Sequence, residues 1–239
     1  TIAIVDPALV ESVPDFIAAD TGMDVLTHAV EAYTSTLAND YTDGLALQAI
    51  KLVFENLESS VKNADFESRE KMHNASTMAG MAFANAFLGM SHSMAHKIGG
   101  FFHTVHGRTN AILLPYVIRY NGTRPAKAAT WPKYNYYKAD VKFQDIAKML
   151  GLPASTPEEA VDALAKAVYD LGVRVGIDMS IKGQGVDEKE YMDTVEEIAY
   201  LAYEDQCSPA NPRLPMVADM VEILQDAYYG YKERPGRIK

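Results

Sequence analysis

The chain has 239 residues, of which 48% are hydrophobic and 23% charged, as is usual for a soluble globular protein with a sizeable core. Its formal charge of −10 argues against a nucleic-acid partner, because phosphate backbones would be repelled. No apolar run approaches the roughly 18 residues of a membrane span, and the first ten residues lack the basic region of a secretory signal. The single cysteine, Cys207, excludes an internal disulfide and a cysteine-rich zinc module. We therefore expect a cytoplasmic protein with no membrane partner, built as one large domain or two small ones.

The first half of the chain changes early from a strand pattern to helical patterns. The opening segment, TIAIVDPAL, is apolar and β-branched, and it predicts a short strand with no partner before it. From Val13 onward, apolar residues recur at helical spacing. The predicted helices are a short one from Pro14, then residues 22–35, capped by Asp20 or Thr21, residues 43–61 and residues 68–87. The last of these has a face of small residues, which predicts a central position in a bundle.

The second half of the chain continues the helical pattern. The helix that carries His92 and His96 is expected to end at Gly99-Gly100, and Pro115 should kink a helix over residues 108–120. Residues 122–140 hold a tryptophan and three tyrosines and predict a long surface loop. The remaining predicted helices are 142–150, one capped by Thr156 with Pro157 in first position, 187–204 and 216–229. The fold expected is an all-α multi-helix bundle with a short N-terminal strand remnant.

Four of the six histidines, His92, His96, His103 and His106, lie within fifteen residues. On a helix, the rings of His92 and His96 leave the same face, with about 6 Å between their Cβ atoms. His103 and His106 are expected in a loop that closes with Gly107. Two histidines on a helix with two more after a turn is a common way to assemble a metal site. Solvated or buried structural histidines are the alternative, which this density of histidines disfavours.

A second cluster, Asp24 and His28, shares one face of a predicted helix. Alone, the pair is also typical of an acidic residue that stabilises the helix dipole beside a half-exposed histidine. With both clusters, five of the six histidines fall in two groups, and His73 is taken as a surface residue. One carboxylate and several imidazoles without a thiolate suit zinc, iron, cobalt or manganese better than calcium or magnesium. The chain lacks the HExxH protease motif and a GxGxxG nucleotide loop.

These residues lie in segments that resemble the iron-dependent alcohol dehydrogenase family. The segments are TGMDVLTHAVEAY at 21–33, GMSHSMAHKIGGFFHTVHGRTNAILLPYVIRYN at 89–121 and EDQCSPANPRLPM at 204–216. WPKYNYY and DQCSPANPR are similar, more narrowly, to the alcohol dehydrogenase part of the bifunctional aldehyde-alcohol dehydrogenases. The resemblance implies that residues 13–239 form a helical metal-binding domain and that residues 1–12 end a nucleotide-binding domain. The chain would then be part of a longer polypeptide and inactive by itself.

The resemblance also implies residue roles. In that family one carboxylate and three imidazoles hold the metal, here Asp24, His28, His92 and His106. The metal expected is Fe(II), with Zn(II) as the alternative. His96 would lie beside the nicotinamide and ribose and relay a proton, and Phe83 and Cys207 would line the substrate pocket. No family role is transferred to His103.

The function implied by the resemblance is an NAD-dependent alcohol dehydrogenase that interconverts a primary alcohol and its aldehyde, with NAD(H) bound in the full-length enzyme. A helical metal-dependent hydrolase would use the same ligands to activate water. The third hypothesis is a non-catalytic assembly module that packs into homo-oligomers or filaments.

Overall fold

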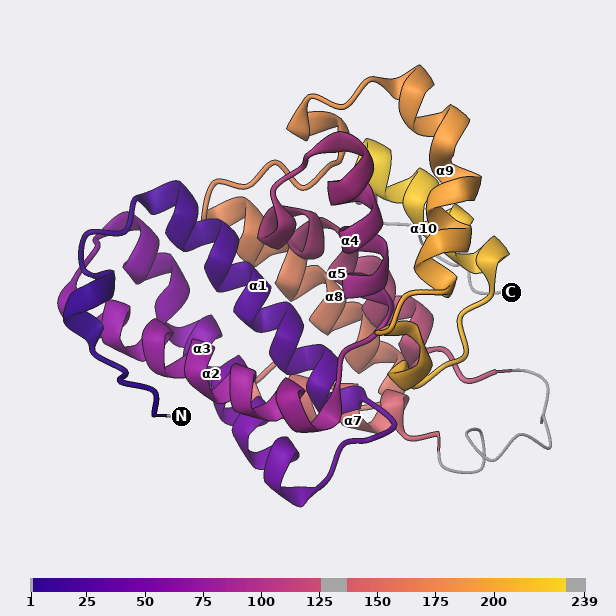
Figure 1. The fold of residues 1–239 in the computed structure, drawn as a ribbon. Coiled ribbons are helices and arrows are strands. Elements are labelled where there is room, and N and C mark those ends of the chain that lie inside the picture. Colours follow the sequence, from indigo (N-terminus) through magenta and orange to yellow (C-terminus); the bar gives the residue numbers. More distant parts are fainter. Residues whose placement is uncertain (1, 126–136, 231–239) are drawn as a thin grey trace.

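The computed structural model describes residues 2–125 and 137–230, and helices form the regular structure of these ranges (Figure 1). The all-α prediction is confirmed for this part of the chain. Within these ranges, none of the helices combines the length and the hydrophobicity that a membrane span requires. In chain order the elements are η1 (Pro7–Val10), α1 (Asp15–Thr34), α2 (Asp40–Lys62), α3 (Phe66–Ala86), α4 (Met90–Phe102), α5 (His106–Gly122), α7 (Ala139–Met149), α8 (Pro157–Arg174), η2 (Lys182–Gln184), α9 (Glu188–Tyr203), η3 (Ser208–Ala210) and α10 (Val217–Tyr229).

Side-chain caps set the start of several helices. The Asn39 side chain accepts hydrogen bonds from the Tyr41 and Thr42 amides, and the Thr42 hydroxyl accepts one from the Asn39 amide, so α2 begins with a capping box. Thr156 caps α8, as predicted, by accepting a hydrogen bond from the Glu159 amide. These caps satisfy amides that the first turn of a helix leaves without a partner.

Three expectations for the N-terminal region are wrong: the strand, the division into two helices and the helix cap. Residues 2–6 have no regular structure and lead into η1, so the strand remnant is absent from the described ranges, where no other strand is available to pair with it. The short helix from Pro14 and the helix over 22–35 are one continuous helix, α1. Thr21 does not cap a helix, since its hydroxyl donates to the Ile17 carbonyl oxygen within α1. Asp20 does not cap one either, because its carboxylate pairs with Arg108 on α5.

The α4–α5 region also differs from the prediction. α4 continues through Gly99 and Gly100 and ends at Phe102, because His103 adopts a left-handed conformation with φ 53°. α5 begins at His106, so this residue does not lie in a loop. α5 continues through Pro115 to Gly122, and α7 begins at Ala139, so helices cover both ends of the predicted 122–140 loop. Its central residues, 126–136, lie outside the described residues.

Helix α5 is shared by two hydrophobic cores. Figure 1 shows α1, α2 and α3 on one side of the molecule, α9 and α10 on the other, and α5 between them. Three α5 side chains belong to the first core, with α1, α2, α3, α7 and α8, and three belong to the second, with α4, α9 and α10. These are Ala111, Leu114 and Ile118 for the first core, and Ile112, Leu113 and Val117 for the second. Since α1 and α4 both pack on α5, their histidine-bearing faces meet beside it.

Candidate metal centre

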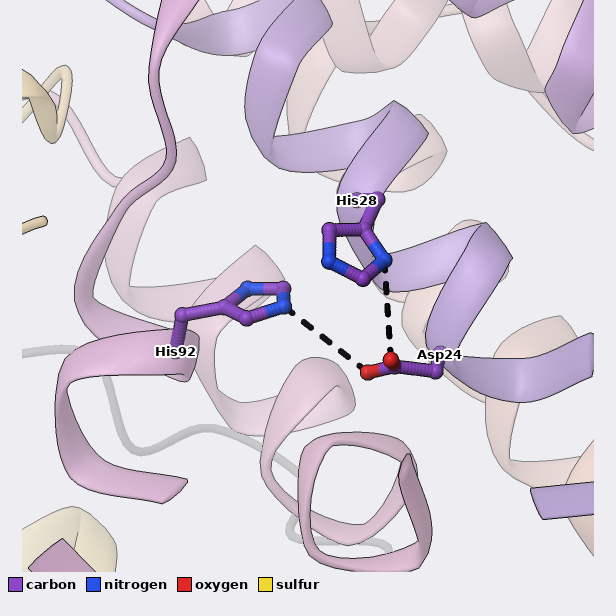
Figure 2. A group of neighbouring side chains, drawn as sticks. All are labelled: Asp24, His28 and His92. Atoms are coloured by element: carbon purple, nitrogen blue, oxygen red, sulfur yellow. Dashed lines mark ion pairs between the residues drawn. The ribbon is translucent and has the colours of Figure 1, made fainter. Parts of the chain in front are cut away.

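The Asp24 carboxylate faces three imidazole rings. Asp24 Oδ2 lies 3.6 Å from His28 Nδ1, and Asp24 Oδ1 lies 3.7 Å from His92 Nε2 and 3.6 Å from His106 Nε2. Figure 2 shows Asp24 and His28 projecting from α1, one turn apart, toward His92 on α4. α5 contributes His106 from its first turn. Three helices that are separate in sequence therefore bring one carboxylate and three imidazoles together.

The distances suit an ion that would lie between the ligand atoms. At 3.6–3.7 Å, the nitrogen and oxygen atoms are too far apart for good hydrogen bonds. A tetrahedral site with bonds of about 2.1 Å places its ligand atoms about 3.4 Å apart, which is close to these separations. The ligand atoms of Asp24, His28 and His92 all lie within 4.8 Å of one another. The group therefore has the size and the donor chemistry of a divalent-metal site.

The environment of His92 is the strongest single observation in favour of a metal site. The residue is 1% exposed, and its Nε2 atom is buried without a hydrogen-bond partner in the part of the chain that the structure describes. Leaving a buried polar atom unpaired costs roughly 1–3 kcal/mol, so such atoms usually have a reason. A metal ion bound between His92 and Asp24 would satisfy this nitrogen.

His106 approaches the carboxylate from the solvent side. Its side chain is 44% exposed, and Asn110 Nδ2 lies 3.1 Å from its Nε2 atom. The same Asn110 nitrogen donates to Asp24 Oδ1 at 2.8 Å. His106 therefore lies beside the Asp24 carboxylate, but it falls outside the compact group of Asp24, His28 and His92.

Two of the imidazoles, those of His28 and His106, are held in the form that binds metals. Burial lowers the pKa of His28 to about 4, and the neighbouring His92 acts in the same direction against the attraction of Asp24. Burial also lowers the pKa of His106, again against Asp24. Both rings are then neutral at neutral pH, and a neutral imidazole nitrogen can coordinate a metal.

His96 lies one turn beyond His92 and has a carboxylate partner of its own. Its Nδ1 is 3.3 Å from Asp205 Oδ2, and its ring stacks on the His106 ring at 5.4 Å between centroids. Burial opposes ionisation of Asp205, but the Lys97 ammonium and the Cys207 amide hold the pKa of Asp205 below its ordinary value. The carboxylate therefore stays ionised and can accept a hydrogen bond from the Nδ1–H group of His96.

Donor atoms of His96, Asp205 and Cys207 form a second compact group. Two observations disfavour it as a metal site. Lys97 Nζ already lies 2.8 Å from the Asp205 carboxylate, and burial, with Asp205, raises the pKa of the Cys207 thiol to about 12. A thiol with that pKa is protonated at neutral pH, whereas the thiolate is the form that binds metals.

The other predicted residues have varied positions. Phe83 stacks on His28 with 4.6 Å between ring centroids, and Cys207 is buried near Asp205. His103 is exposed and ends α4. His73, predicted as a surface residue, is half-buried, with its Nε2 atom enclosed.

Three residues of the site were not predicted from the sequence: Glu31, Asn110 and Asp205. Glu31 Oε2 lies 2.6 Å from His92 Nδ1, and Asn110 and Asp205 contact the site as described above. The one signal for Glu31 was a carboxylate that continues the Asp24–His28 face of α1. Asp205 gave no such signal, because its contact joins a loop to α4. Asn110 lies four residues after His106 on α5, but its contact with Asp24 on α1 has no local signal.

Comparisons with known proteins show what the chain is similar to. Residues 18–228 match the model of the C-terminal part of the Fe-containing alcohol dehydrogenase family. The whole chain is 80% identical to the aldehyde-alcohol dehydrogenase of Streptococcus pneumoniae serotype 2 and spans 27% of that protein. It is 42% identical over 229 residues to an NADPH-dependent butanol dehydrogenase of Clostridium saccharobutylicum, with 96% of the chain and 55% of the relative covered. The iron-containing alcohol dehydrogenase structure from Thermococcus thioreducens superposes with a TM-score of 0.82 at 35% identity, covering 96% of this chain and 55% of that one.

Proposed function

Because the chain belongs to the Fe-containing alcohol dehydrogenase family, we propose that it forms the metal-binding part of an NAD(P)-dependent alcohol dehydrogenase that interconverts a primary alcohol and its aldehyde. The metal proposed is Fe(II), with Zn(II) as the alternative, and its ligands are Asp24, His28, His92 and His106. The observation that carries the proposal is the buried, unpartnered Nε2 of His92 opposite the Asp24 carboxylate. A metal held there would act as a Lewis acid toward the substrate oxygen, and hydride transfer is the chemistry of the nicotinamide.

The chain's own residues would position the substrate and move its proton. The hydrogen bond from His96 Nδ1 to Asp205 leaves His96 Nε2 free as the proton acceptor. In this proposal His96 takes the alcohol proton at Nε2 during oxidation and returns it during aldehyde reduction. The stacked ring of His106 restricts the orientation of His96.

Phe83 supports the apolar side of the proposed site. Its ring covers one face of His28, which limits the access of water to that imidazole. The buried Cys207 thiol, protonated at neutral pH, would serve as a neutral wall of the substrate pocket.

The nicotinamide would be bound largely by another part of the polypeptide. The chain spans only 27% of its aldehyde-alcohol dehydrogenase relative and 55% of its butanol dehydrogenase relative. We assign the residues from 13 onward to the helical metal-binding domain and residues 1–12 to its connection with a nucleotide-binding domain. The complete site would then lie where the two parts meet.

Metal analysis tests the ligand assignment. The purified protein, loaded with Fe(II) under anaerobic conditions, should retain one metal ion per chain, and His92→Ala and Asp24→Ala should each lose most of it. Asp140→Asn is a matched control, because this buried carboxylate at the start of α7 pairs with Arg124 and touches no histidine in the described residues. Stoichiometric metal in both site variants would overturn the assignment.

Activity of the full-length polypeptide tests the reaction. It should reduce NAD⁺ or NADP⁺ in the presence of a primary alcohol, and His92→Ala should abolish this activity while Asp140→Asn retains it. If the metal-loaded protein reduced neither cofactor in the presence of a primary alcohol, the proposed reaction would be contradicted. The assignment of the metal ligands would not be affected.

A further inference from the structure

Glu31 is a buried carboxylate directly behind the proposed metal site. It lies on α1, three residues after His28, and is 3% exposed. Its Oε1 atom accepts a hydrogen bond from the Ser91 amide at 2.7 Å, and its Oε2 atom accepts one from the Gly89 amide at 3.0 Å. These two amides belong to the first turn of α4 and to the residue before it. The carboxylate therefore joins α1 to the N-terminus of α4, where the helix dipole favours a negative charge.

The backbone of α4 is shaped for this contact. A Cβ atom added at Gly89 would lie 2.9 Å from Glu31 Oε1 and 2.7 Å from Asn211 Oδ1, so a larger residue would displace the carboxylate. Asn211 Oδ1 accepts the next amide, that of Met90, at 3.2 Å. The start of α4 is thus held by side chains from two other parts of the chain.

The third hydrogen bond of Glu31 reaches the imidazole of His92. Glu31 Oε2 is 2.6 Å from His92 Nδ1, a short separation for a hydrogen bond between an imidazole and a carboxylate. A carboxylate can only accept, so the proton must sit on Nδ1. His92 Nε2 then carries a free lone pair and points toward Asp24 Oδ1, 3.7 Å away.

We propose that Glu31 is the positioning residue of the metal centre: it fixes the orientation and the tautomer of His92 so that Nε2 is ready to coordinate. The inference rests on the proposed metal site and names the residue that prepares it. A carboxylate behind a metal-binding histidine raises the basicity of the ligand, and loss of such a partner typically weakens metal binding about 10–100-fold. A residue that only caps α4 would not control which nitrogen of His92 carries the proton.

Glu31→Gln separates these two roles. The amide keeps the shape of the side chain, and its oxygen can still accept one of the α4 amides. With the oxygen kept on the Ser91 amide, the shorter of the two backbone hydrogen bonds, the NH₂ group faces His92 Nδ1 and can only donate. A donor opposite Nδ1 moves the ring proton to Nε2, where it blocks coordination. We expect Zn²⁺ affinity, measured by competition with a chromophoric chelator, to fall about 10–100-fold in Glu31→Gln and to stay unchanged in Asp140→Asn.

The second measurement is the tautomer of His92 in the metal-free protein, from the ¹⁵N shifts of its ring nitrogens. The wild-type protein should carry the proton on Nδ1, and Glu31→Gln should shift it to Nε2. Wild-type Zn²⁺ affinity in a folded Glu31→Gln protein would overturn the role of Glu31 while leaving the metal site in place. Should the variant not fold, the wild-type spectrum still decides, since an Nε2–H tautomer there would overturn the inference. A wild-type protein that binds no Zn²⁺ or Fe(II) would overturn the proposed metal site as well.

Discussion

At Gly107, the first turn of α5 rests directly on the backbone of α1. A Cβ atom added at Gly107 would overlap the Asp20 carbonyl oxygen and would lie 2.9 Å from the Asp20 carbonyl carbon and 3.1 Å from Asp24 Cβ. Carbon atoms normally pack at about 3.5–4.0 Å, so Gly107→Ala would push the two helices apart by roughly 0.5–1 Å. The obstructing atoms are mainly backbone of a buried helix and cannot rotate away.

Two effects of opposite sign set the expected loss of stability. Overpacking of this kind costs about 1–3 kcal/mol. Replacing glycine by alanine in a helix returns up to about 1 kcal/mol. The net expectation for Gly107→Ala is a decrease of about 1–2 kcal/mol in the free energy of unfolding. Since His106 is the preceding residue, the same shift would move its imidazole away from Asp24 and weaken metal binding.

Gly44 provides the matched control. It lies in the exposed part of α2, and a Cβ atom there would meet nothing within 4 Å. Gly44→Ala should therefore raise the free energy of unfolding by about 0.5–1 kcal/mol. Equilibrium urea denaturation of the metal-free protein measures both variants, and chelator competition measures Zn²⁺ affinity. A Gly107→Ala protein with wild-type stability and wild-type Zn²⁺ affinity would refute the close packing of α5 on α1.

Two further predictions concern the proton relay and the thiol. In the full-length enzyme, His96→Ala should lower turnover far more than metal content, because the ring contacts Asp205 and not Asp24; parallel losses would make His96 a ligand. Alkylation of Cys207 by iodoacetamide should be very slow at neutral pH, and its rate should keep rising with pH without a plateau while the protein stays folded, because burial and Asp205 raise the thiol pKa to about 12. Rapid alkylation of the folded protein at pH 7 would contradict this description of the thiol.

Local sequence patterns were sufficient to predict features that depend on residues of one helix or of its cap. The four-residue spacing of Asp24 and His28 predicted that they share a face of α1, and Thr156 with Pro157 predicted the start of α8. The resemblance to the family then separated His92 and His106 from His96, a division that spacing alone did not make. The structure brings His92 and His106 to within 3.7 Å of Asp24 Oδ1 and leaves His96 beside Asp205.

Contacts between residues distant in sequence explain the features that local patterns did not predict. Gly99 and Gly100 were expected to end α4, but packing carries the helix on to Phe102, and a non-glycine residue, His103, adopts the left-handed conformation that ends it. Asp20 was expected to cap a helix, but it lies inside the long helix α1. Its carboxylate there pairs with Arg108 of α5, 88 residues away. Glu31 was missed for the same reason, since its partners lie 58–61 residues away.

X-ray absorption at the metal edge tests the central claim most directly. For the Zn²⁺-loaded protein, the set of Asp24, His28, His92 and His106 predicts only nitrogen and oxygen neighbours at about 2.0–2.2 Å. In His92→Ala, whose weakened site is kept filled by saturating Zn²⁺, the imidazole scattering should fall by one ring. The other compact group of donors contains Cys207. A sulfur neighbour at about 2.3 Å, or an imidazole signal unchanged in His92→Ala, would contradict the account.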